Sequence, residues 1–196
     1  MMTLKQTPSQ TVGPYFAYGL TPQQYNYDLA SVFDAVIADN SAKGEHIQVI
    51  GQVLDGAGKP VGDAMLEFLQ ADADGRYIAS TEDIVSSGFT GYARIGTGTD
   101  VQQRYVLHTV KPGATAAGQA PHINLIVFMR GLLVHAFTRL YFDDEAHANS
   151  EDEILNSVPL ERRHTLIAKR EWQAGGAVYR FDIQMQGADE TVFFDV

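Results

Sequence analysis

Alternating apolar and polar residues characterise the chain after about residue 45. The first such run includes Ile47 and Val49, and the dipeptide Asp55-Gly56 ends it. A period of two is typical of a strand with one buried face, and Asp-Gly is a frequent turn. Later apolar segments bounded by turn residues predict further strands at 65–70, 104–110, 122–129, 133–142, 178–186 and 191–194.

Many short strands separated by turn signals predict an all-β fold, an antiparallel β-sandwich with few short helices. One segment, 159–169, is rich in Leu, Glu, Arg and Ala, which favour helix, and Ser157 is its expected N-cap. The predicted domain spans residues 45–196.

Residues 1–44 differ from the rest of the chain. They contain many Gln, Tyr, Pro and Ser residues and show little alternation. Pro8, Pro14 and Pro22 favour an extended or turning path, with a short helical region expected within 28–37. The aromatic residues of this segment argue against a freely solvated tail. We therefore predict an extended N-terminal arm that lies on this chain or on a partner subunit.

The charge and the absence of cysteine exclude several classes of function. With 24 acidic and 14 basic residues the formal net charge is −10, which disfavours nucleic acid and anionic membranes as partners. No cysteine is present, which excludes disulfides, zinc–thiolate sites, iron–sulfur clusters and thiol nucleophiles. No apolar run approaches the roughly 20 residues that span a bilayer. These features fit a cytoplasmic protein.

Histidines on predicted strands are the first candidates for metal binding. His108, His122 and His135 each lie on such a strand, but no His-x-His pair places two rings on one face, because position 124 is Asn124. Structural roles are the simpler interpretation for all three. The acidic run 143–145 is likewise interpreted as a helix cap or a charge patch rather than a calcium or magnesium site.

Arg130 is more informative, because it ends an apolar strand beside Gly131. Arginine at such a position could receive a carboxylate through two parallel hydrogen bonds, although a surface salt bridge is the simpler alternative. From the residues alone, we predict a β-rich domain with an aromatic arm and no evident catalytic set. This deficit favours a binding or subunit role.

Particular motifs extend this interpretation. In chain order they lie at 7–15, 51–56, 70–75, 109–113, 120–124 and 179–195. Together they resemble the intradiol ring-cleavage dioxygenases over nearly the whole chain. The resemblance of the final segment is to alpha-type subunits of this family.

The resemblance also shows where the chain departs from the family's iron site. Catalytic chains of the family hold a non-haem ferric ion with two tyrosines and two histidines, the latter as a His-x-His pair. Here His122 is followed by Asn124, and Thr115 stands where a tyrosine follows the Lys-Pro-Gly turn. The stretch between Tyr77 and Phe89 offers no match for the other tyrosine. Because amide and hydroxyl groups cannot replace these donors to Fe(III), the three positions are expected to be vestigial and no metal is expected in this chain.

The resemblance implies a non-catalytic alpha subunit, inactive alone, that assembles with a beta subunit into a larger hetero-oligomer. The beta subunit would hold Fe(III), and protocatechuate would be opened by dioxygen between its hydroxylated carbons to 3-carboxy-cis,cis-muconate. The substrate would bind at the alpha–beta interface, where this chain forms a pocket wall. The residues matching that wall are Thr11, Gly13, Pro14, Tyr15 and Arg130.

Two other interpretations stay open from the sequence. One is a self-contained intradiol enzyme that cleaves catechol. The other is a structural β-sandwich binding protein without a role in a substrate cleft.

Overall fold

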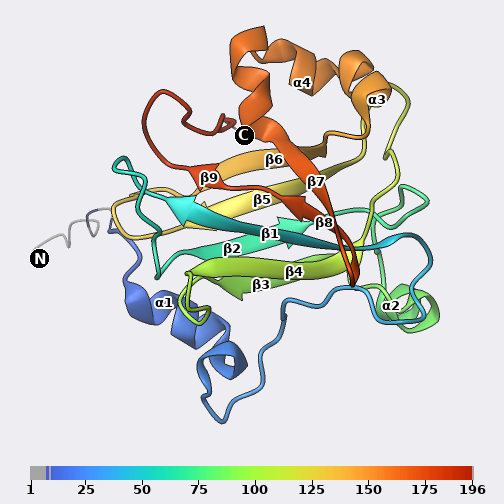
Figure 1. Ribbon diagram of the computed structural model, residues 1–196. Helices are drawn as coiled ribbons and strands as arrows, with labels where there is room; N and C mark the ends of the chain where they lie inside the picture. The colour runs from blue at the N-terminus through green and yellow to red at the C-terminus, as the bar shows by residue number, and fades with distance from the viewer. Residues whose placement is uncertain (1–7, 9, 196) are drawn as a thin grey trace, which may run out of the picture.

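The computed structural model describes residue 8 and residues 10–195. Within this part of the chain, one sheet has the strand order β3-β2-β5-β6-β7-β8-β1-β4, with β9 paired to β1, and curves into a nearly closed barrel (Figure 1). The strands are β1 (His46–Leu54), β2 (Met65–Leu69), β3 (Tyr92–Gly96), β4 (Arg104–Val110), β5 (His122–Phe128), β6 (Ala136–Phe142), β7 (Ile167–Gln173), β8 (Gly176–Arg180) and β9 (Ile183–Gln184).

The core lies inside this curved sheet and follows the alternation of the sequence. In β1, Ile47, Val49 and Val53 are buried, while the residues between them are partly exposed, except for the buried Gly51. Leu66 of β2 and Leu125 of β5 belong to the same cluster and are fully buried. Burial of each such side chain contributes about 1.5–3 kcal/mol before conformational entropy is subtracted.

The expected all-β class with few helices is confirmed, but the antiparallel sandwich is not confirmed in detail. β1 pairs with β8 and with β9 in parallel, and so does β6 with β7. The β6–β7 pairing joins the two halves of the sheet, which therefore forms one continuous surface. An alternating pattern shows which face is buried but carries no strand direction, so parallel pairs could not be predicted from it.

The helices depart from the sequence predictions. In the described residues they are α1 (Pro14–Leu20), η1 (Pro22–Tyr25), α2 (Thr81–Ser87), α3 (Ala146–Glu151), α4 (Glu153–Ser157) and η2 (Leu160–Leu166). The predicted helix at 159–169 is wrong in extent, because η2 ends where β7 begins and Ser157 closes α4. Leu166 and Ala168 are buried against the sheet, so packing overrides helix propensity.

The arm also corrects two expectations. Residues 28–37 contain no helix, whereas Pro14 and Pro22 each begin one. Proline is favoured at a first helical position because its missing N–H needs no partner there. The prediction of an extended or turning path was therefore wrong at Pro14 and Pro22, because proline is excluded only from the interior of a helix.

Residues of the arm pack on this chain's own sheet. The rings of Phe16 and Phe128 lie 5.5 Å apart, and Gln24 exchanges two hydrogen bonds with the backbone of Gly96 on the edge strand β3. Val36 bridges His108 of β4. Figure 1 shows α1 at the opposite end of the sheet from α3 and α4. The first residues of the predicted arm motif, including Thr7, lie outside the described residues apart from Pro8.

No helix in the described part of the chain is both long enough and apolar enough to cross a membrane.

Candidate functional site

The arm is fastened beside Arg130 at the hairpin that joins β5 to β6. The hydroxyl of Thr11 accepts a hydrogen bond of 2.8 Å from Gly131 N and lies 3.4 Å from Met129 O. Gly131 has a φ of +92°, a conformation that favours glycine. The structure therefore brings two of the predicted wall residues, Thr11 and Arg130, together across about 120 positions of sequence.

Helix α1 directs Tyr15 outward. Gly13 is its extended N-cap and Pro14 its first residue. Phe16 and Ala17 turn inward, Ala17 being buried, so the preceding residue faces away from the sheet. Tyr15 is 81% exposed and makes an edge contact with Tyr18 at 5.7 Å. Its ring is thus presented to whatever lies outside this chain.

Arg130 also points outward, with 67% of its side chain exposed. Its Nε lies 3.2 Å from Oδ2 of Asp63, a carboxylate that is nearly buried and receives no hydrogen bond from the described residues. The predicted salt bridge exists, yet it engages Nε and leaves both Nη atoms without hydrogen-bond partners in the described structure. Such a guanidinium can still receive a carboxylate through its outer edge.

An apolar groove lies beside this arginine. It has a volume of about 210 Å³ and lies between the arm residues Val12 and Phe16 and the hairpin residues 132–135. Leu133 and Val134 are 63% and 70% exposed. His135 lies here, its ring 4.7 Å from that of Phe137. Exposed apolar side chains around a groove are typical of a surface that another chain covers.

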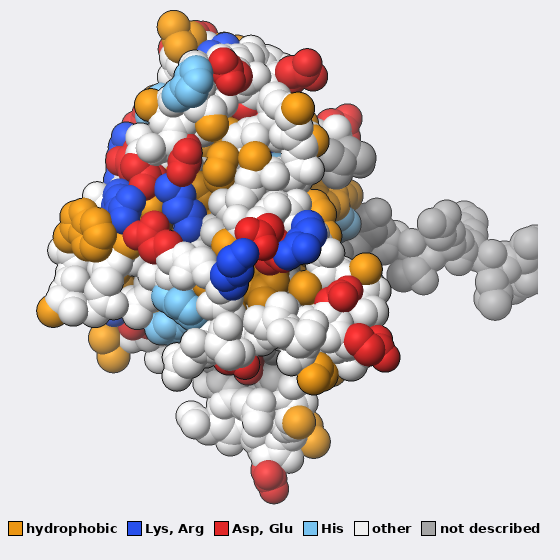
Figure 2. All heavy atoms as spheres, turned by 90° about the vertical axis from the view of Figure 1, so that its right-hand side faces the viewer, with side chains coloured by type: hydrophobic (Ala, Val, Ile, Leu, Met, Phe, Trp, Pro, Cys, Tyr) orange, Lys and Arg blue, Asp and Glu red, His pale blue; other side chains and the backbone are white. Residues whose placement is uncertain are grey.

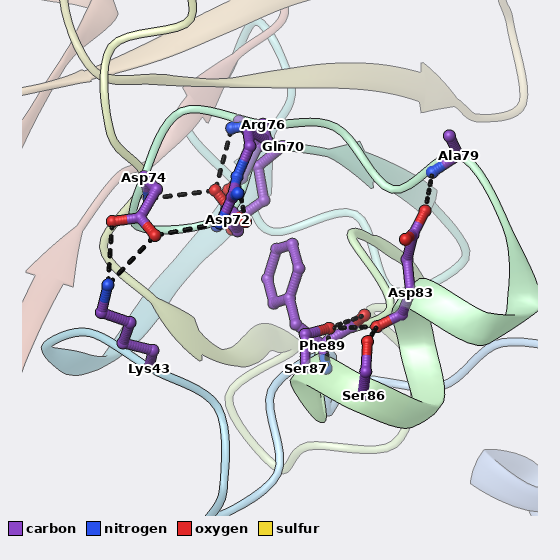
Figure 3. A network of polar contacts seen from close by, with 11 residues as sticks. Lys43, Gln70, Asp72, Asp74, Arg76, Ala79, Asp83, Ser86, Ser87 and Phe89 are labelled. Atoms are coloured by element: carbon purple, nitrogen blue, oxygen red, sulfur yellow. Dashed lines mark hydrogen bonds and ion pairs between the residues drawn. The ribbon is translucent and has the colours of Figure 1, made fainter.

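A tight turn at residues 72–76 leads to the positions that the sequence predicts to be vestigial. Oδ1 of Asp72 accepts hydrogen bonds from Asp74 N and Arg76 N, and Arg76 and Lys43 both contact the Asp74 carboxylate (Figure 3). Gly75 has a φ of +80°, and a Cβ there would lie 2.0 Å from the carbonyl oxygen of residue 114. The turn is therefore pressed against the 113–115 loop and delivers the next residue to the outer face of β5.

That next residue is Tyr77, which is not among the site residues predicted from the sequence. Its hydroxyl lies 3.3 Å from Nδ2 of Asn124, and Oδ1 of Asn124 accepts a 3.0 Å hydrogen bond from Nε of Arg139. Both contacts fall at the position where the family has its second histidine. The signal for Tyr77 was its place two residues after Gly75, and no sequence signal marked Arg139.

His122 and Thr115 have other partners. His122 is 3% exposed, its Nδ1 lies 2.8 Å from Ala120 O, and burial together with the nearby Arg139 charge lowers its pKa. Thr115 donates a hydrogen bond of 2.5 Å to Oε1 of Gln119. His108 lies on β4 in the other half of the sheet. His135, predicted on a strand, lies in the hairpin just before β6, which begins at Ala136. The three histidines are therefore not brought together.

These donors do not fit a ferric ion. Both ends of the Asn124 amide are occupied, and the guanidinium beside it places a fixed positive charge at the site. Within the described residues, no group of three or more His, Asp or Glu side chains could hold a metal. A phenol and one buried imidazole remain, which is too few and too weak a set for Fe(III).

The acidic run 143–145 forms a charge network, as its interpretation as a charge patch predicts. Oδ2 of Asp144 accepts hydrogen bonds of 2.9 Å from Lys111 and Tyr179, and it also contacts Arg170. Although burial opposes the effect, these contacts lower the pKa of Asp144. Figure 2 shows acidic and basic side chains intermixed on the face of the molecule that it draws. The network is a structural feature of the sheet surface.

Comparison with known proteins identifies the family. A family model described as "Dioxygenase" matches residues 12–187. The chain is 66% identical over 197 residues to the protocatechuate 3,4-dioxygenase alpha chain of Burkholderia cepacia, with 100% of both chains covered. The chain belongs to the intradiol ring-cleavage dioxygenase family.

A second relative supports membership of this family, which depends on non-haem iron, and a solved structure shows the fold. The protocatechuate 3,4-dioxygenase beta chain of Burkholderia cepacia is 31% identical over 207 residues, covering 97% of this chain and 84% of that one. The solved dioxygenase domain of a carbohydrate-binding fusion protein from Streptomyces sp. SirexAA-E has a TM-score of 0.63 at 24% identity, covering 94% and 100%. The latter shows that the fold is the intradiol dioxygenase fold.

Proposed function

We propose that this chain is the non-catalytic alpha subunit of a hetero-oligomeric enzyme that cleaves protocatechuate. The observation that carries the proposal is the full-length identity of 66% to an alpha chain, against 31% to the beta chain of the same organism. The unsuitable donor set around Asn124 supports it, because a chain without an iron site needs a catalytic partner. Fe(III) and ring cleavage to 3-carboxy-cis,cis-muconate then belong to the beta subunit. The chain's cytoplasmic location stays a prediction.

In this proposal, the arm and the β5–β6 hairpin form one wall of the substrate pocket at the interface with the beta subunit. Residues 1–44 are the arm that contacts the partner, and residues 45–196 are the intradiol-dioxygenase-like domain. Thr11 fixes the arm to the hairpin, Gly13 and Pro14 set the start of α1, and Tyr15 offers a flat aromatic surface.

Arg130 supplies the charge that the substrate requires. Protocatechuate carries a carboxylate, and a chain with a net charge of −10 repels it at long range. A local cation whose outer nitrogens are free compensates for this repulsion at short range. Asp63 contributes an ion pair with Nε at 3.2 Å on the inner side of the guanidinium.

Co-expression with the beta subunit tests the proposal. We expect the chain purified alone to contain no stoichiometric iron and to consume no dioxygen with protocatechuate. The complex is expected to contain iron in proportion to its beta subunits and to open the ring. About one iron per chain in the lone subunit, with a tyrosinate-to-iron colour, would favour the self-contained enzyme instead.

A second arm of the experiment addresses the purely structural alternative. If beta subunits refolded without this chain cleave protocatechuate with an unchanged KM, the chain forms no part of the pocket. If KM rises without this chain and returns when it is added, the pocket-wall role is supported.

A further inference from the structure

A second pocket lies on the outer face of β5 and β6 and shares no lining residue with the groove beside Arg130. Its volume is about 290 Å³. The pocket is covered by Ile154 of α4 and by the C-terminal residues Phe194 and Asp195. A hydrogen bond from Phe194 N to Phe137 O holds this C-terminal segment over β6. Volumes near 300 Å³ are at the lower end of those that bind small molecules.

Arg139 is the only strongly basic side chain that lines this pocket, and one of its hydrogen-bond donors has no partner among the described residues. Its Nε donates to Oδ1 of Asn124, but its Nη1 is fully buried and has no hydrogen-bond partner among the described residues. No acidic side chain of residues 10–195 forms an ion pair with it. A partly buried guanidinium stays charged, and a donor without a partner is unfavourable until an anion supplies one.

The walls and the remaining charge limit which anion fits. Phe137, Ile154 and Phe194 provide apolar surfaces on which a ring can pack. Asp195 also lines the pocket and repels negative charge, so a dianion such as phosphate is disfavoured against a monoanion. A planar carboxylate matches the guanidinium in shape as well as in charge.

We propose that this pocket binds a small aromatic monocarboxylate, with the carboxylate on Arg139 and the ring between Phe137 and Phe194. The site is separate from the wall at Arg130 and does not depend on the function proposed for that wall.

Calorimetric titration of the full-length chain, alone and within its complex, with benzoate as the probe tests the proposal. Benzyl alcohol is the neutral isostere of the probe. We expect one benzoate site per chain. The Kd of benzyl alcohol is expected to be at least about tenfold higher than that of benzoate, because the charged hydrogen bonds are lost. Arg139→Met is expected to abolish this site. Arg180→Met, which removes another partly exposed arginine, is the matched control and is expected to retain it.

Ile154→Trp provides an independent variant, since it fills the pocket and leaves the guanidinium in place. Loss of the site in Ile154→Trp supports the proposal even if Arg139→Met fails to fold. Titration of Arg130→Met within the complex separates this site from the interface, because the site on Arg139 is expected to persist there. The proposal is overturned if folded Arg139→Met or Ile154→Trp binds benzoate as the parent chain does, or if benzyl alcohol binds as tightly as benzoate.

Discussion

Two regions differ in how far their polar groups are hydrogen-bonded: the arm surface, which comprises Tyr15 and the adjacent Arg130, and the cluster of Tyr77, Asn124 and Arg139. At the arm, Tyr15 and Arg130 point outward and keep unused binding capacity. At the cluster, Asn124 of β5 contacts Tyr77 in a loop and Arg139 of β6. Exposed groups keep free hydrogen-bonding capacity at the arm surface, whereas the groups around Asn124 satisfy most of theirs among themselves.

The difference matters for mutagenesis. A substitution of an exposed side chain usually changes folding stability by less than about 0.5 kcal/mol, so an effect on turnover can be assigned to the interface. A substitution inside the cluster removes a hydrogen bond between distant segments of this chain, one of them part-buried, and therefore acts first on stability. The following experiments use this contrast.

The largest effect on folding stability is expected at Asp152. This fully buried carboxylate accepts hydrogen bonds from Ala120 N, Leu155 N and the hydroxyl of Tyr141. Asp152→Ala leaves three donors without a partner and removes the N-cap of α4, so we expect the free energy of unfolding to fall by about 3 kcal/mol. Urea denaturation measures this. Glu153→Gln, one residue later and exposed, is the control and is expected to change it by less than about 0.5 kcal/mol. Equal effects of the two variants would contradict a structural role for Asp152.

Among substitutions at the proposed pocket wall, that of Arg130 is expected to have the largest effect on the KM for protocatechuate. In the complex, Arg130→Gln should raise the KM for protocatechuate about tenfold, because a charge-assisted contact with the carboxylate is lost. Arg76→Gln, which removes a similarly exposed and ion-paired arginine, should leave KM unchanged. The substitution also leaves Asp63 without its cation, which could lower stability. Asp63→Asn combined with Arg130→Gln should restore stability but not KM, and a restored KM would show that Arg130 acts only through folding.

The strands that alternate cleanly were predictable from the sequence, and the exceptions have physical causes. The strand at 104–110 is confirmed residue for residue as β4, because alternation and a Lys-Pro-Gly turn define both ends. β7 was missed since Lys169 and its neighbours favour helix, and only pairing with β8 and burial of Ala168 make them a strand. The final predicted strand at 191–194 is reduced to a single bridge from Phe194.

The candidate site was predictable as a set of residues but not as a geometry. The resemblance named Thr11 and Arg130, yet their proximity depends on a hydrogen bond between distant segments that no local pattern specifies. Arg139 looks like any arginine on an exposed strand face. Its significance arises only when Asn124, opposite it in the β5–β6 register, and the C-terminal tail enclose it.

Tyr15 provides a smaller and cleaner test of the arm. It is 81% exposed, so Tyr15→Ala should leave the melting temperature of the lone chain unchanged while raising the KM of the complex about threefold, the loss expected for part of one aromatic contact. Tyr27→Ala, a second exposed aromatic residue of the arm, is the control for general effects on the arm. Steady-state kinetics and calorimetry measure both quantities. An unchanged KM in Tyr15→Ala would remove this ring from the pocket wall.

The smallest expected effect is a pH dependence of stability from the cluster. Burial and the Arg139 charge lower the pKa of His122 in the folded chain below its usual value of 6.5. Between the folded pKa and about 6.5 the unfolded chain binds more protons, so stability is complete above about pH 6.5 and falls as the pH falls through the folded pKa. Comparing melting temperatures at pH 7.5 and 5.0, we expect His122→Asn to reduce the loss seen in the parent chain, and His147→Gln, whose ring is exposed, to leave it unchanged. If all three proteins lose the same stability on acidification, His122 is not held neutral by its surroundings, and the cluster is less tightly closed than the contacts around Asn124 indicate.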